Sequence, residues 1–147
     1  PYCIENISSK VSQYTYQLDN VIPWTSETST PSNGFIWTGG LLYDTIIDRK
    51  ASLDTLMDID LFFYGENEYK LKTLSQILKN LTNNKYKYLV GFNKSIVYIF
   101  IQGIPRIIQL IFNSKLLYKL PNISFLQNHV LQLVLDIQNY LIQESIF

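Results

Sequence analysis

Residues 58–64 read Asp-Ile-Asp-Leu-Phe-Phe-Tyr, and this alternation constrains the fold more than any other part of the chain. Successive side chains of a β-strand point to opposite faces, so the pattern predicts a strand that turns Ile59 and Leu61 into the core. Asp58 and Asp60 then share the opposite face. Apolar residues on both sides of the acids favour a central strand over an edge strand, where charges deter edge-to-edge pairing.

The remaining patterns predict an α/β or α+β fold, with a mixed central sheet of about five strands and flanking helices. Alternating apolar residues between turn residues mark further strands at 35–38, 86–92, 95–102 and 106–112. A short helix is predicted at 41–47 and a longer one at 67–81. The longer helix carries its apolar residues on one face: Leu71, Leu74, Ile77, Leu78 and Leu81.

At 147 residues the chain is expected to form a single domain. We divide it into an N-terminal arm and loop at 1–33, a core at 34–112 and a C-terminal helical part at 113–147. The long C-terminal helix is predicted to start at Pro121-Asn122 or at Ser124 and to run to about residue 145. Its apolar stripe is broad, which favours docking onto a partner subunit or a second copy of the chain in a homo-oligomer.

Net charge is zero, but the two signs are unevenly distributed. Seven of the twelve acids lie between Asp44 and Glu68, whereas 70–119 holds nine basic residues and no acid. An acidic segment next to a basic segment suits the binding of a metal-bound polyphosphate. Lysines that only keep a helix and the edges of hairpins soluble would produce the same charge distribution. Alternating Lys and Tyr at 85–88 could contact single-stranded nucleic acid; a half-exposed strand is the simpler interpretation.

Two residue counts exclude several classes of site. Cys3 is the only cysteine and His129 the only histidine. A disulfide within the chain, a Cys/His metal cluster and a Ser-His-Asp hydrolase triad are therefore excluded. The longest apolar runs are too short to span a bilayer and no signal peptide pattern occurs, so we expect a cytoplasmic protein without membrane contact.

The acid pair and a glycine pair together suggest phosphate chemistry. Two carboxylates on one face of a strand repel each other, and a bound cation relieves that repulsion. Gly39 and Gly40 stand between a strand and a helix, where backbone N–H groups can bind phosphate, although a structural turn is the simpler interpretation. Nucleotidyl transfer uses both features, because carboxylate-bound divalent cations hold the attacking and leaving oxygens.

The order of these motifs resembles the signature of the polymerase-β-like nucleotidyltransferase superfamily. That signature is a glycine pair, a short helix and an acid-hydrophobic-acid strand. Residues 39–44, Gly-Gly-Leu-Leu-Tyr-Asp, are similar to the Gly-Gly-x-x-Arg-Asp opening of the tRNA CCA-adding and poly(A) polymerase branch. The Tyr-Gly at 64–65 and the Ile-Gln at 108–109 resemble divergent members from large DNA viruses. The resemblance covers about residues 34–112.

This resemblance implies a nucleotidyltransferase-like fold and a nucleoside triphosphate substrate. Asp58 and Asp60 would be the catalytic residues and the ligands of Mg²⁺ or Mn²⁺, and Gly39 and Gly40 would lie under the triphosphate. The implied reaction transfers a nucleoside monophosphate to a hydroxyl of an RNA 3′ end, a nucleotide or a protein. The implied setting is a viral protein in a cytoplasmic virus factory or a virion.

Three positions depart from that pattern. Tyr43 stands where the poly(A) polymerase branch has arginine, and Gln109 and Asn122 stand where a third carboxylate is expected. Losing a carboxylate that bridges metals or acts as a base costs orders of magnitude in rate. The alternative prediction is therefore a catalytically silent nucleotidyltransferase-fold module with a structural or partner-binding role in a viral assembly.

Overall fold

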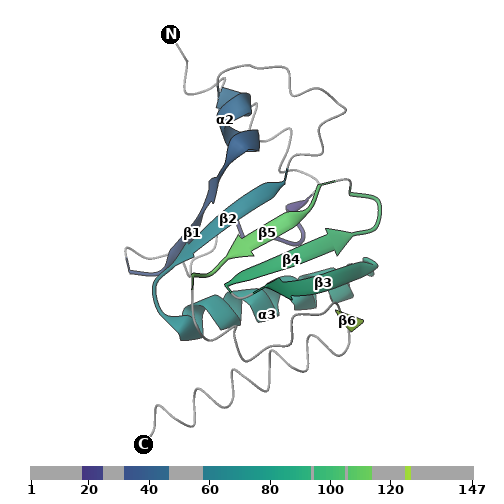
Figure 1. The fold of residues 1–147 in the computed structure, drawn as a ribbon. Helices are drawn as coiled ribbons and strands as arrows, with labels where there is room; N and C mark the ends of the chain where they lie inside the picture. Colours follow the sequence, from purple (N-terminus) through teal and green to yellow (C-terminus); the bar gives the residue numbers. More distant parts are fainter. Residues whose placement is uncertain are drawn as a thin grey trace, which may run out of the picture.

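The computed structural model describes residues 18–24, 32–46, 58–93, 95–104, 106–113 and 125–126; for 44–46 and 125–126 it describes the backbone alone. These residues form a mixed sheet with two helices, which confirms the predicted mixed α+β class (Figure 1). The strands are β1 (Gly34–Thr38), β2 (Ile59–Tyr64), β3 (Tyr88–Asn93), β4 (Ile96–Ile101), β5 (Ile108–Ile111) and β6 (Phe125–Leu126). The helices are α2 (Gly40–Ile46) and α3 (Asn67–Asn83).

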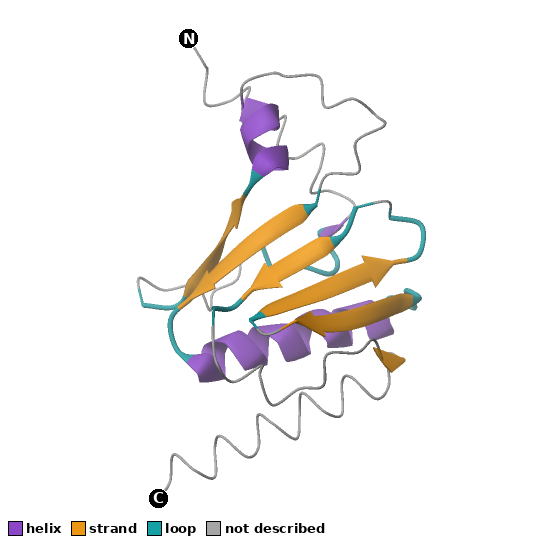
Figure 2. Ribbon diagram, in the orientation of Figure 1, coloured by secondary structure: helices purple, strands orange, loops and turns teal. Residues whose placement is uncertain are grey.

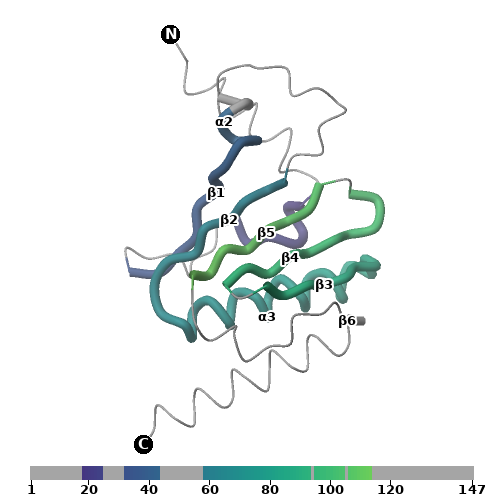
Figure 3. The backbone as a smooth tube through the Cα atoms, viewed as in Figure 1, coloured from purple at the N-terminus to yellow at the C-terminus, as the bar shows by residue number. Residues whose placement is uncertain are grey.

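The sheet has the strand order β1-β2-β5-β4-β3-β6 in the described part of the chain. Neighbouring strands run antiparallel except β2 and β5, which are parallel. Figure 3 shows β2 and β5 side by side in the sheet. Parallel strands need a crossover connection, and α3 with the β3–β4 hairpin supplies it. The prediction of about five strands matches the five longer ones, since β6 has only two residues.

Helix α3 covers one face of the sheet (Figure 2). Its predicted apolar face is buried throughout, and each fully buried side chain of this size contributes about 1.5–3 kcal/mol. Lys70 on α3 also donates from Nζ to the carbonyl oxygen of Phe112, just after β5, at 2.7 Å. Burial lowers the pKa of Lys70. Neither described helix is long and apolar enough to cross a membrane.

The turn from Leu18 to Trp24 belongs to the core, although the sequence predicted only an arm and a loop there. Leu18, Val21 and Ile22 are fully buried. The side chain of Asn80 on α3 donates to the carbonyl oxygen of Val21 at 3.0 Å and so ties this turn to the helix. The described core therefore begins before residue 34.

Strand β2 has the predicted alternation. Ile59, Leu61 and Phe63 are buried, whereas Asp60 and Phe62 lie on the opposite face of the sheet, which we call the outer face. Because β2 pairs with both β1 and β5, it is an inner strand, and the edge-strand explanation of the acids is wrong. Gly65, with φ +103°, directly follows the last residue of the strand.

The start of the predicted C-terminal helix is wrong. Phe125 and Leu126 form β6, which pairs antiparallel with Val90 and Leu89 of β3. An open strand edge offers unpaired N–H and C=O groups. At these two residues, backbone hydrogen bonding to the edge of β3 outweighed the helical spacing of the apolar side chains. The rest of that helix, the arm at 1–17 and the loop at 25–31 lie outside the described residues.

Candidate functional site

The turn between β1 and α2 places glycine directly against an acid of β2. Gly39 has φ +92°, a left-handed conformation that favours glycine. A Cβ built at Gly39 would collide with the carboxylate of Asp60, Oδ2 first. The backbone conformation at residue 39 therefore favours glycine, and a side chain there would fit only if the Asp60 carboxylate moved. Helix α2 then begins at Gly40 and has only seven residues, so the site does not depend on a long helix dipole.

Asp58 and Asp60 lie half-buried on the outer face, as predicted. Burial raises the pKa of Asp60, and the negative charge of Asp58 raises it further. The Oδ1 atom of Asp60 is buried and has no hydrogen-bond partner within the described residues. A buried acceptor without a partner is costly, and a proton, a donor or a cation at Oδ1 would relieve that cost.

Gln109 completes a polar cluster with the two acids. It lies directly opposite Asp60 in the β2–β5 register and opposite Tyr98 in the β4–β5 register. Its Nε2 donates to Oδ2 of Asp58 at 2.5 Å. The sequence predicted that Gln109 would take the place of a third carboxylate on this strand, and the structure puts it next to both acids. The hydrogen bond to Asp58 forms only because two strands distant in sequence pair, so no local sequence pattern could have predicted it.

The structure brings Gly39, Asp58 and Asp60 together with Gln109. Gly40 begins α2, and Tyr43 is 60 % exposed on that helix. Asn122 and the side chain of Asp44 lie outside what the structure describes. Within the described residues, no three acidic, histidine or cysteine side chains are grouped closely enough to hold a metal ion.

Asp58 and Asp60 are the described residues that could hold one hard divalent cation. Mg²⁺ and Mn²⁺ prefer carboxylate oxygens, and Mg²⁺ in phosphate sites often takes one or two carboxylates and completes its shell with phosphate and water. The unpartnered Oδ1 of Asp60 and the mutual repulsion of the acids agree with such a role. Two carboxylates are fewer than a two-metal centre normally uses, because two cations share bridging ligands.

Comparison of the chain with protein-family models, curated proteins and solved structures found no match. Any functional inference therefore depends on the residues and geometry of this chain.

Proposed function

We propose that this domain binds a nucleoside triphosphate together with Mg²⁺ on the outer face of its sheet. Asp58 and Asp60 would hold the cation, and the turn at Gly39 and Gly40 would approach the phosphates. The observation that carries the proposal is the state of Asp60. Its Oδ1 is buried and has no hydrogen-bond partner in the part of the chain that the structure describes, its pKa is raised, and the backbone of Gly39 lies against the same carboxylate.

Bound Mg²⁺ would supply charge neutralisation for the phosphates and the acids. The chain itself would supply position: the inner strand β2 carries Asp60, the hydrogen bond from Gln109 holds Asp58 just before that strand, and the absence of a Cβ at Gly39 lets the backbone approach Asp60 closely. In an active enzyme these residues would hold the triphosphate for transfer of a nucleoside monophosphate to a hydroxyl acceptor, with RNA 3′ ends, nucleotides and proteins as the candidate classes.

Isothermal titration calorimetry with Mg²⁺ and each nucleoside triphosphate tests the proposal. Wild type should bind at least one of them, and Asp58→Ala/Asp60→Ala should abolish the heat. Asp19→Asn is the matched control, because Asp19 is an exposed acid on a turn outside the outer face and its loss should leave binding unchanged. Absence of binding by the wild type would refute the proposal.

A second candidate function is a catalytically silent module of the same fold, with a structural or partner-binding role. The observation that favours it is Gln109, whose neutral amide is bonded to Asp58 next to both acids. An amide donor there ties up a carboxylate oxygen and supplies neither a negative charge nor a base.

Gln109→Asp separates the two candidates. A silent module would bind the nucleotide without incorporating a labelled nucleoside monophosphate into any acceptor, and Gln109→Asp would gain incorporation. An enzyme would show incorporation as wild type, and Asp58→Ala would remove it. Gln76→Asp is the matched control, because Gln76 is an exposed glutamine on helix α3, on the opposite side of the sheet from the acids.

A further inference from the structure

The outer face carries a second feature, on β3 and β4. Two cross-strand pairs lie next to each other there: Leu89 opposite Phe100, and Lys87 beside Gln102. Leu89 is 47 % exposed and Phe100 is 43 % exposed, although large apolar side chains on a sheet are usually covered. Lys87 and Gln102 are exposed as well. We call these four residues the β3–β4 patch.

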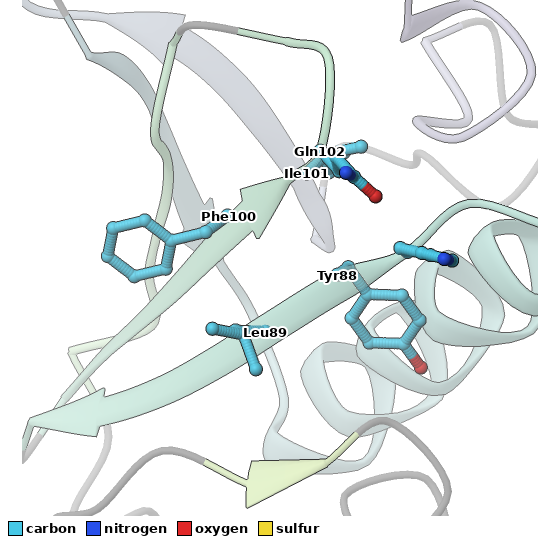
Figure 4. A pocket seen from close by; sticks show the side chains of 6 residues that line it. Tyr88, Leu89, Phe100, Ile101 and Gln102 are labelled. Atoms are coloured by element: carbon cyan, nitrogen blue, oxygen red, sulfur yellow. The ribbon is translucent and has the colours of Figure 1, made fainter.

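The patch lines a cavity of about 390 Å³, to which the buried residues Tyr88 and Ile101 also contribute. This volume lies within the range of about 300–1,000 Å³ that is usual for small-molecule sites. In Figure 4, Phe100 and Leu89 project from neighbouring strands, whereas Tyr88 turns toward helix α3. The cavity therefore offers an aromatic face beside an aliphatic side chain.

The polar groups of the patch suit an anionic ligand. Among the described lining residues, Lys87 supplies a cation and Gln102 an amide, and none carries a carboxylate. The chain has no acid anywhere from Lys70 to Lys119. An aromatic ring for stacking, a nearby cation for phosphate and an amide for hydrogen bonds are the groups that proteins use to bind single-stranded nucleic acid.

We propose that the β3–β4 patch binds a nucleotide unit of single-stranded nucleic acid, with its base stacked on Phe100 and its phosphate beside Lys87. On the same face, Gln109 of β5 lies opposite Asp60 of β2 on one side and opposite Tyr98 of β4 on the other. Phe100 lies in β4, two strand spacings or about 10 Å across the sheet from β2. A strand bound at the patch can therefore extend toward the acids, but its binding does not require them.

Fluorescence anisotropy with a labelled single-stranded oligoadenylate, in EDTA, tests this proposal apart from the metal site. Wild type should bind in a saturable manner, and Phe100→Ala should weaken binding about fivefold or more, as expected for the loss of one stacked base. Ile36→Ala is the matched control, because Ile36 is a 55 % exposed apolar residue of β1 on the same face.

Lys87→Gln should lower the salt dependence of binding by about one released counterion. Lys72→Gln is its control, since Lys72 is exposed on α3, on the opposite side of the sheet. Circular dichroism would verify that each variant is folded. Equal effects of Phe100→Ala and Ile36→Ala, or no saturable binding by the wild type, would refute the proposal.

Two other occupants of the patch are outcomes of the same experiments. If sedimentation shows a dimer that Phe100→Ala dissociates, and the oligonucleotide does not bind, a second copy covers the patch and the proposal is wrong. If truncation after Leu126 is required before the oligonucleotide binds, the chain's own C-terminal residues cover the patch, and the proposal is wrong for the full chain.

Discussion

Substitution of Gly39 by alanine tests the closest contact of the candidate site. The variant would incur two separate costs. Its backbone must hold an L-residue at φ +92°, and its new Cβ must displace the carboxylate of Asp60. The first cost is about 1–2 kcal/mol, and overpacking of this kind typically adds about 1–3 kcal/mol. We therefore expect Gly39→Ala to lose about 2–5 kcal/mol of unfolding free energy.

Gly103→Ala isolates the backbone cost. Gly103 has φ +88°, close to that of Gly39, but a Cβ there would meet nothing within 4 Å. This variant should lose only about 1–2 kcal/mol. The difference between the two variants measures the collision with Asp60, because the backbone cost is common to both.

Urea unfolding of both variants provides the measurement. Combining Gly39→Ala with Asp60→Ala should recover most of the extra loss, since the carboxylate is then gone, and the double-mutant cycle gives the coupling energy. If Gly39→Ala and Gly103→Ala unfold at the same urea concentration, and the cycle shows no coupling, the argument that Gly39 is needed for close approach to Asp60 is wrong.

Three further changes have expected outcomes. Because the pKa of Asp60 is raised in the folded state, the contribution of this residue to stability falls as pH rises from the ordinary pKa of 3.8 toward the raised one. Without divalent cations, Asp60→Asn should therefore be more stable than wild type at neutral pH. In urea titrations this difference in unfolding free energy should vanish below pH 3.8. Leu74→Ala, at a fully buried position of α3, should cost about 2–5 kcal/mol in the same assay. Asn33→Ala should cost about 0.5–2 kcal/mol, because the Asn33 Oδ1 accepts the N–H of Glu66 at 2.7 Å at the start of α3; Asn33→Asp, which keeps the acceptor, should recover most of it.

Local periodicity was sufficient to predict much of the fold. The alternation at 58–64 and the apolar stripe of α3 each arise within one element, and both are present in the structure. The positions of Asp58 and Asp60 on one face follow from the same period. The strand bounds differ by one or two residues at several ends, because ends depend on pairing partners and not on the period.

The features that sequence reasoning missed all depend on distant partners. Burial of the turn at 18–24 depends on α3, to which Asn80 ties it. The strand β6 depends on the open edge of β3. The bond from Gln109 to Asp58 depends on the register of a parallel pair, for which a short sequence window carries no signal. Each is a tertiary contact that overrides a local preference.

The parallel pairing of β2 and β5 has a consequence for the order in which the chain folds. The β3–β4 hairpin closes over a short turn and α3 is local, so both can form early. Pairing of β2 with β5 closes a loop that contains the whole α3–β3–β4 segment, so it carries a larger cost in chain entropy. Asp58 and Gln109 bridge that late contact. The acids should therefore acquire their native surroundings among the last events of folding, and partly folded chains should have no competent site.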